Sequence, residues 1–567
     1  MQPLKSAYKA LILVFMLFAV YLYFTSPEVS LNNVYYLILT LGCILLGFVA
    51  EKSYLNKFYT PLETEHKLII GQALIILAIG TALRFYALNF GLPHNYHPDE
   101  IPKVNAVMRM YQQGSLDPDY FLHPSLLLYS TYFSNYLFHL FGAEGDFQQT
   151  AFLAGRTVSA IAGSLSVFLV YLTAKEVFQK RTALLASCLL AVAPIHITCS
   201  RYLKEDSLLV FFILLTTYFS LLALRKNSIR FLCLAGLTAG LSASTKYSGA
   251  LSCSILVFIP WMKSGKLLPD RKLFIGLCIA SLFSVAGFLA ATPYSILNSA
   301  KFLKDVGYES RHMSKGHTTA VDAWSQYWMY HLSRSILLGT GLLLIIAGMF
   351  KTGIIFGRKN LKELFLVALL FMFYLSAEYV KSKPAPQPER YILPCIPFLV
   401  IIAAALFEDF NAVVKKRIFH YVCIFILAFS PLKRSLELAS ELKYDTRVQM
   451  SDWINQNIPA GAKFLTDRRA YAPLLDNAKY TSQQLSGSNI LQDLDVKRLR
   501  KMEFDYLIIS SLFYGRYFTE PNVEPITRQR IRDLSKYFQE VKVIESAHGS
   551  YGFHNPKLIL LSLKPRS

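Results

Sequence analysis

Long apolar segments recur along most of this 567-residue chain, and they restrict its fold more than any other feature. Each runs for about 18–22 residues, enough for a helix to cross a hydrocarbon core of about 30 Å. Hydrophobic residues make up 53% of the sequence and charged residues only 17%, which is rare in soluble proteins of this size. The sequence therefore predicts a polytopic α-helical membrane protein.

Basic loops indicate how the chain crosses the membrane, because Lys and Arg gather on the cytoplasmic side. Lys5 and Lys9 lie at the start of a first span at about 8–25, so the N-terminus is expected inside. No small-residue cleavage site follows this span, which is expected to be retained. Spans at 33–50 and 68–89 then carry the chain to the outer face. The same pattern predicts about thirteen spans in all, with the C-terminus outside.

The segment 123–141 is long enough to cross but carries Ser, Thr, Tyr, Asn and His side chains. If it crossed, the basic segment 175–181 would lie outside, against the charge rule. We expect instead an amphipathic helix in the outer interface. The next span is then at 155–177, and residues 90–155 form one large external loop.

Composition argues against two classes of site. The net charge of +21 could indicate nucleic-acid binding, but Lys and Arg that hold cytoplasmic loops inside explain a positive balance without it. We therefore expect contacts with membrane lipids and no nucleic-acid partner. All eight cysteines lie in or beside apolar runs, without a C-x-x-C motif, and indicate neither a disulfide framework nor a thiolate metal site.

The chain becomes polar near residue 435, which predicts a transmembrane catalytic domain over 1–434 and an external domain over 435–567. Four short apolar segments, "AKFLTD", "FDYLIISS", "VKVIES" and "KLILLSL", are typical of strands, and helical stretches separate some of them. A small α/β domain is therefore expected. It could serve as a lid, as an acceptor-docking module or as a passive appendage.

Charged residues gather at the predicted outer ends of the spans. A transporter would place such groups near the midplane, between repeated halves, and the sequence shows no internal repeat. The pattern favours an active site that faces outward at the membrane surface. The residues are Asp99, Glu100, Lys103, Arg156, Arg201, Lys204, Glu205, Asp206, Lys246, Glu378, Lys381, Lys383, Glu389 and Arg390.

Glycosyl transfer from a lipid-linked sugar needs both kinds of charge in one place. A carboxylate takes the proton of the attacking acceptor hydroxyl, and Lys or Arg stabilises the phosphate that leaves. Because the donor's tail lies in the bilayer, such a site must sit at the interface. The alternatives are an oligosaccharide ligase or polymerase, with a polyprenyl-diphosphate donor, and a lipid or glycan transporter.

Four motifs, in order, resemble those of the GT-C glycosyltransferases, in particular the protein O-mannosyltransferases and the aminoarabinose transferase of lipid A. They are "HPDE" at 97–100, "YFLHPSLLLY" at 120–129, "SRYLKEDSLLVFF" at 200–212 and "ERYILPCIP" at 389–397. The resemblance covers about residues 70–410. It implies a polyprenyl-phosphate sugar donor, inversion at the anomeric carbon, and a lipid, glycan or protein acceptor.

The resemblance also assigns residues. It makes Asp99 the catalytic base, with Glu100 beside it, and Asp206 a second acid. Leu122 and His123 stand where the aminoarabinose transferase has a Glu-Lys pair, and this departure argues against its metal site here; a divalent metal ion stays an open alternative. The candidates for binding the donor phosphate are Arg390, Lys246, His123, Arg201, Lys204 and Lys383. Further candidates in the external loops are His97, His312, His317 and Arg156.

Each candidate also has a purely structural interpretation. Asp99 and Glu100 could cap an interfacial helix, since acids favour its first turn. Asp206 could pair with Arg201 or Lys204. Lys246 could be a snorkelling anchor, Arg390 could belong to a Pro-stiffened positive loop, and the two histidines after residue 310 could be solvated.

We therefore expect an integral membrane glycosyltransferase that moves one sugar from a polyprenyl-phosphate carrier to an external acceptor. The retained N-terminus and the few external cysteines fit a bacterial inner membrane, with the active site and the C-terminal domain in the periplasm.

Overall fold

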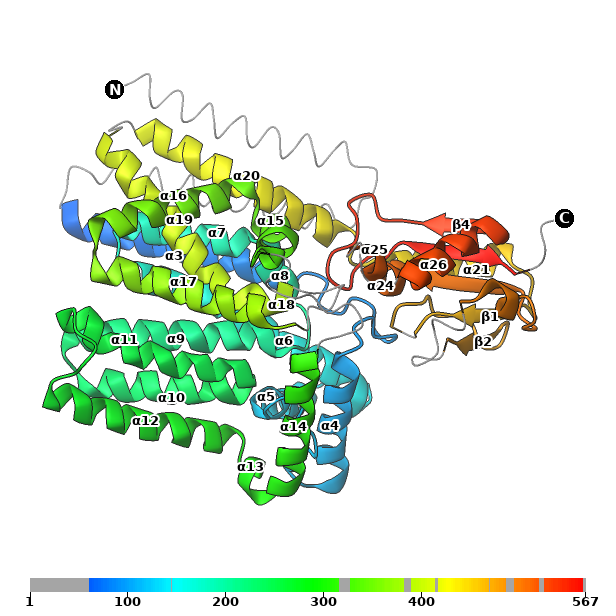
Figure 1. Cartoon of the computed structure of the whole chain (residues 1–567), viewed down its shortest axis with the longest axis horizontal. Helices are drawn as coiled ribbons and strands as arrows, with labels where there is room; N and C mark the ends of the chain where they lie inside the picture. The colour runs from blue at the N-terminus through cyan, green and yellow to red at the C-terminus, as the bar shows by residue number, and fades with distance from the viewer. Residues whose placement is uncertain are drawn as a thin grey trace.

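The computed structural model describes residues 61–143, 145–315, 327–381, 389–413, 417–468, 470–485, 494–519 and 525–563. The first two expected spans, together with His317 and Lys383, lie outside these residues. The described chain forms a bundle of long helices with a small α/β domain at one end (Figure 1).

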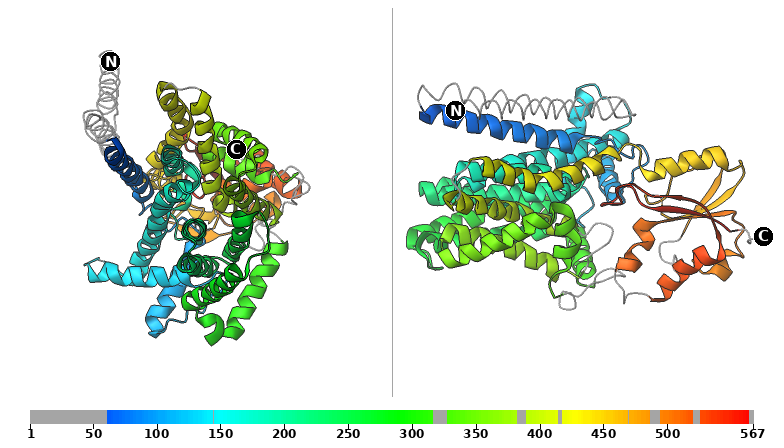
Figure 2. Two further views of the ribbon diagram at one scale, coloured as in Figure 1. Left: turned by 90° about the vertical axis from the view of Figure 1, so that its left-hand side faces the viewer. Right: turned by 90° about the horizontal axis from the view of Figure 1, so that it is seen from above.

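The bundle helices run roughly parallel and lie side by side (Figures 1 and 2). They are α3 (Pro61–Phe85), α6 (Phe147–Ala174), α7 (Lys180–Val192), α9 (Glu205–Lys226), α10 (Ile229–Thr245), α11 (Cys253–Ser264), α12 (Arg271–Ala291), α16 (Leu342–Arg358), α17 (Leu361–Tyr379), α19 (Ile396–Val413) and α20 (Arg417–Ser440). Small residues allow close packing. Gly236 and Gly240 of α10 lie so near the backbone carbonyls of Ala280 and Ser284 of α12 that any side chain would clash.

Within the described residues, four helical segments are long and apolar enough to cross a membrane, or five if the bent pair Leu332–Thr340 and Leu342–Arg358 is one span. The four are Phe147–Ala174, Glu205–Lys226, Arg271–Ala291 and Glu389–Phe410. The multi-pass membrane fold is confirmed, but the prediction of about thirteen spans exceeds this number. Part of the difference arises because bundle helices such as α7 and α11, with 13 and 12 residues, are too short.

Helix α5 (Leu126–Leu140) runs across the direction of the bundle: Figure 1 views it along its axis, and Figure 2 shows it extending sideways. One side of α5 packs on the protein, where Asn135 Nδ2 donates to the carbonyl of Phe147 at 2.9 Å. The other side exposes Phe133, Leu137 and Leu140. The structure thus has the two-sided helix expected over 123–141, and its position at the membrane interface stays a prediction.

The C-terminal region forms a mixed five-stranded sheet in the order β2-β1-β3-β5-β4, which confirms its α/β character. Strand β1 (Lys463–Thr466) pairs in parallel with β2 (Thr481–Gln484) and β3 (Tyr506–Ser510), while β5 (Leu558–Ser562) is antiparallel to β3 and to β4 (Gln539–Ile544). Four strands match the expected segments. All four residues of β2 are exposed, so its sequence lacks the alternation that marks a strand.

Shorter helices complete the fold. At the domain end of the bundle they are α4 (Glu100–Gln113), α8 (Pro194–Cys199), η2 (Tyr247–Ser252), α13 (Tyr294–Leu297), α14 (Ser299–Lys315), η3 (Leu332–Ile336), α15 (Leu337–Thr340), α18 (Glu389–Ile392) and η4 (Leu393–Cys395). In the α/β domain they are α21 (Thr446–Asn457), α23 (Val496–Leu499), α24 (Ser511–Tyr514), α25 (Arg516–Thr519) and α26 (Pro525–Tyr537). Helix α20 continues through the expected domain boundary at 434/435 and ends at Ser440.

Impermeant thiol labelling of single-cysteine variants in intact cells should distinguish the two ends of the bundle. In a cysteine-free background, Gly145→Cys should be labelled and Lys180→Cys should not, because we expect the basic cluster at 175–181 to lie in the cytoplasm. Permeabilised cells provide the control, in which both cysteines should react. Labelling at 180 but not at 145 would contradict the predicted orientation.

Candidate functional site

Asp99 immediately precedes α4, at the domain end of the bundle. Its Oδ2 accepts hydrogen bonds from Lys204 Nζ at 2.9 Å and from Arg390 Nη1. The Asp99 side chain is 37% exposed, whereas those of Lys204 and Arg390 are 4% and 14% exposed. Two shielded cations thus hold one accessible carboxylate.

The charge state of Asp99 follows from these partners. Burial alone would raise the pKa of the Asp99 carboxyl, but the ammonium of Lys204 and the guanidinium of Arg390 outweigh it. The pKa is therefore held well below its ordinary value. Asp99 is ionised at neutral pH.

Tyr391 lies beside two of the cations. The Arg390 guanidinium is 5.2 Å from the centre of the Tyr391 ring, and Lys246 Nζ is 5.0 Å from it. Lys246 also pairs with Asp206 Oδ1 at 2.8 Å. We call Asp99, Lys204, Arg390, Lys246 and Asp206 the outer ionic cluster. Asp206 thus pairs with Lys246, and not with Arg201 or Lys204 as the structural interpretation of the sequence suggested.

Glu100 turns away from Asp99 into the protein. Both of its carboxylate oxygens accept from Arg156, at 2.9 and 2.7 Å, and Oε1 also accepts the Leu203 N–H at 2.8 Å. Arg156 donates further to the carbonyls of Leu88 and Phe90. The pair is fully buried and joins the start of α4 to α6 and to the segment before α9.

His123 lies within reach of the charges around the site. The pKa of His123 is lowered to about 3, mainly by burial; Glu205 opposes this shift, and the ammoniums of Lys103 and Lys204 add to it. His123 is therefore neutral and can offer a hydrogen bond, but no charge, to a phosphate. Lys103 itself pairs with Glu205 at 3.2 Å and donates to the Asp99 carbonyl.

Three other expected residues are not members of the outer ionic cluster. Arg201 is buried and donates to the Leu83 carbonyl at 2.7 Å, so it ties its segment to α3. His97 is buried between rings of both domains. His312 lies on α14 and stacks on Tyr308.

Glu309 of α14 belongs near the site, and the sequence analysis missed it. On the same helix face, Asp305 accepts the Phe121 N–H at 3.0 Å, and Met313 Sδ lies 4.0 Å from the Tyr391 hydroxyl. Glu309 lies between them at helical spacing and is half-buried. The helical spacing of residues 305, 309 and 313 could have indicated a shared helix face. The sequence prediction assigned this segment only to an external loop.

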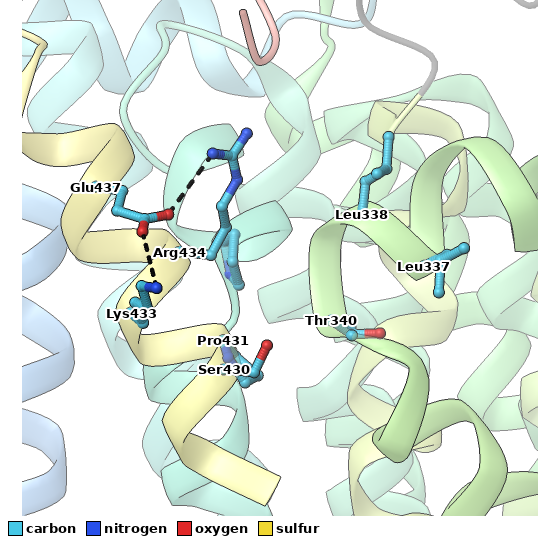
Figure 3. A pocket seen from close by; sticks show the side chains of 10 residues that line it. Leu337, Leu338, Thr340, Ser430, Pro431, Lys433, Arg434 and Glu437 are labelled. Carbon is cyan, nitrogen blue, oxygen red and sulfur yellow. Dashed lines mark ion pairs between the residues drawn. The ribbon is translucent and has the colours of Figure 1, made fainter. Parts of the chain in front are cut away.

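One pocket of the described residues is lined by none of the residues of the outer ionic cluster. It has a volume of about 330 Å³ and lies between α8, α15 and α20, where Lys433 and Arg434 pair with Glu437 (Figure 3). None of the expected site residues lines it. Among the described residues, no group of three or more His, Cys, Asp or Glu side chains could hold a metal ion.

Sequence comparison finds mannosyltransferases. Residues 128–290 match the family model described as Dolichyl-phosphate-mannose-protein mannosyltransferase. The putative mannosyltransferase YkcB of Bacillus subtilis (strain 168) is 40% identical over 136 residues, which cover 24% of this chain and 18% of that protein. Dolichyl-phosphate-mannose--protein mannosyltransferase 1 of Saccharomyces cerevisiae is 26% identical over 263 residues, which cover 42% of this chain and 30% of the yeast protein.

Structure comparison shows the fold. The crystal structure of the Archaeoglobus fulgidus oligosaccharyltransferase, tethered with an acceptor peptide, aligns with a TM-score of 0.53 and 13% identity. The alignment covers 86% of this chain and 74% of that one. The fold is GT-C-like, and the resemblance to the GT-C glycosyltransferases and their protein O-mannosyltransferases that the motifs predicted is confirmed.

Removal of the Glu100 carboxylate should destabilise the protein. Glu100→Ala leaves the Arg156 guanidinium buried without its counter-ion, which typically costs about 3–5 kcal/mol. The midpoint of thermal unfolding in detergent should therefore fall sharply. Glu503→Ala is the control, because the Glu503 side chain is 93% exposed and its surface ion pair with Lys463 should contribute little. An unaltered midpoint for Glu100→Ala would show that the buried pair is dispensable for the fold.

Proposed function

We propose that this chain is an integral membrane glycosyltransferase that moves one sugar from a polyprenyl-phosphate carrier to an external lipid, glycan or protein. The observation that carries the proposal is the accessible Asp99 carboxylate held by Lys204 and Arg390. A carboxylate that could accept a proton and two cations that could bind a phosphate lie together there, which supports the proposal. The matches to dolichyl-phosphate-mannose-dependent proteins support the same donor class.

Asp99 acts as the general base. It takes the proton of the acceptor hydroxyl while that oxygen bonds to the anomeric carbon, which inverts its configuration. The bond from the anomeric carbon to the phosphate oxygen breaks, and the carrier phosphate keeps the electron pair. Arg390 and Lys204 stabilise the charge that develops on this phosphate.

Arg390 suits this role better than a lysine would. Its planar guanidinium can donate two parallel hydrogen bonds to one phosphate, and Tyr391 restricts it through the ring contact and a hydroxyl 3.4 Å from Nη2. Asp206 in turn fixes Lys246 beside the same ring. Asp206 is therefore a positioning residue, and its loss should cost less activity than loss of Asp99.

Donor binding also activates the base. In the structure, Lys204 and Arg390 donate hydrogen bonds to the Asp99 carboxylate. In the proposed reaction the donor phosphate requires the same two cations. When the phosphate takes over hydrogen bonds from Arg390, Asp99 loses part of the attraction that lowers its pKa. The carboxylate becomes a stronger base only when the donor is in place.

The site and the C-terminal domain face the periplasm of a bacterial inner membrane in this proposal. The donor's tail stays in the bilayer, and the acceptor arrives from the aqueous side of α4 and α14. The opposite end of the bundle then faces the cytoplasm, because its loops are basic and Lys and Arg gather on that side.

Asp99→Asn should abolish sugar transfer while donor binding persists. The amide keeps the shape but cannot accept the proton, and general base catalysis is worth about a hundredfold to ten-thousandfold. Transfer from labelled polyprenyl-phosphate mannose to membranes of the source cells measures it. Asp146→Asn is the matched control, because Asn caps α6 as well as Asp146 does. Turnover of Asp99→Asn within a few-fold of wild type would refute the assignment, and transport without transfer would indicate a transporter.

The pH profiles should separate the free enzyme from the donor complex. Activity requires ionised Asp99 and is lost as the pH falls through its pKa, which is low in the free enzyme because of Lys204 and Arg390. The acid limb of kcat/KM for the donor should therefore lie at lower pH than that of kcat. Arg390→Ala should move the limb of kcat/KM upward. Coincident limbs in the wild-type enzyme would contradict activation of the base by the donor.

A further inference from the structure

The C-terminal domain inserts the segment 551–555 against the loop that carries Asp99. The ring centre of Phe553 lies 4.3 Å from that of His97, and the Tyr202 ring lies 4.4 Å from His97 on another side. All three side chains are buried. A histidine of the membrane domain is thus enclosed partly by a ring of the C-terminal domain.

The packing that fixes the His97 ring also restricts the backbone of Asp99. The His97 Nδ1 accepts the backbone N–H of Asp99 at 3.2 Å. Burial lowers the pKa of His97 well below its ordinary value, against the opposing effect of Asp99, so the ring is neutral and Nδ1 can remain an acceptor. A displaced His97 ring would therefore displace the backbone of the base.

A hydrogen bond fixes the segment 551–555 to the bundle. The Tyr202 hydroxyl accepts the Phe553 N–H at 3.1 Å. Gly552, at a φ of 61°, allows this approach, because a Cβ at that position would lie 2.7 Å from the same hydroxyl. Glycine is the residue that fits both the left-handed backbone and the short distance.

A buried arginine joins the same parts. Arg447 forms a double ion pair with Asp445, at 2.7 and 2.8 Å, and donates to the carbonyl of Phe553 at 2.7 Å. It also donates to the Tyr96 carbonyl at 3.4 Å and lies 3.7 Å from the centre of the Tyr96 ring. Arg447 thus holds the Asp99 loop and the segment 551–555 together from within the α/β domain.

We propose that the C-terminal domain positions the catalytic base: Phe553 and Arg447 fix His97 and Tyr96, and His97 fixes the backbone of Asp99. This inference rests on the proposed function of Asp99. Phe553, Arg447 and His97 touch no reacting atom and are positioning residues. The domain is then part of the catalytic unit rather than a lid or a passive appendage.

Loss of the contacts that position Asp99 should lower the turnover number. A reacting group displaced by about 1 Å can cost on the order of a hundredfold in rate, even when the altered residue is remote from the chemistry. Among the described residues, the ring contacts of Phe553 are with His97, Tyr202 and Tyr471, and not with Lys204 or Arg390, so we expect the donor KM to change little. Because partial unfolding also lowers the apparent kcat without changing KM, kcat is expressed per folded enzyme in every variant, and a loss that remains after this correction reports the position of the base.

The test compares Phe553→Leu with Phe464→Leu in the full-length protein, using labelled polyprenyl-phosphate mannose. Phe464 is buried in the same domain against Tyr480 and Tyr506. It therefore reports the effect of a core truncation alone. Phe553→Leu should lower kcat about tenfold or more, with the donor KM within about threefold, while Phe464→Leu should retain wild-type kcat in the folded fraction.

Two variants keep the test decisive if Phe553→Leu folds poorly. Tyr202→Phe keeps the ring but removes the acceptor of the Phe553 N–H, and it should lower kcat by a smaller factor. His97→Leu should lower kcat as Phe553→Leu does, whereas His97→Asn, which restores an acceptor near Nδ1, should recover part of the loss. Full activity of Tyr202→Phe and His97→Leu would overturn the positioning role. If Asp99→Asn were also active, the proposed function itself would be wrong.

Discussion

The buried ion pair of Glu100 with Arg156 is the interaction on which the outer end of this molecule depends. Neither side chain reaches solvent, and a charge buried this deeply is tolerated only when it is paired and its hydrogen bonds are satisfied. Arg156 meets this need with the Glu100 carboxylate and two backbone carbonyls, and Glu100 also accepts the Leu203 N–H. The pair therefore locates the first turn of α4 relative to the bundle.

The adjacent carboxylates consequently have opposite surroundings. Asp99 precedes the first turn of α4, and Glu100 begins it, so their side chains point in different directions. Glu100 faces an arginine that cannot leave, whereas Asp99 faces two cations that a phosphate could compete for. Two acids that look equivalent in the sequence thus separate into a structural group and a candidate catalytic group.

The sequence predicted whatever depends on local pattern and missed what depends on distant pairing. Apolar length was sufficient to predict the membrane fold, and polar residues in 123–141 were sufficient to predict the helix α5, because each acts over neighbouring residues. The partner of Asp206 could not be predicted, since Lys246 is 40 residues away and several cations were candidates. Glu309 shares a helix face with residues 305 and 313, but it was missed because the distant segments that this face contacts could not be predicted. Arg390 was expected near the phosphate, but its bond to Asp99 spans 291 residues.

The short loop from Tyr96 to Glu100 explains how one site can respond to both domains. Its side chains diverge: Tyr96 and His97 pack on the α/β domain, Asp99 points to the ionic cluster, and Glu100 points into the bundle. Because the backbone between them is only a few residues long, a shift of one contact must move the others or strain the loop. Contacts with both domains therefore fix the backbone position of Asp99. Under the proposal that Asp99 is the base, the α/β domain would contribute to catalysis without touching the sugar.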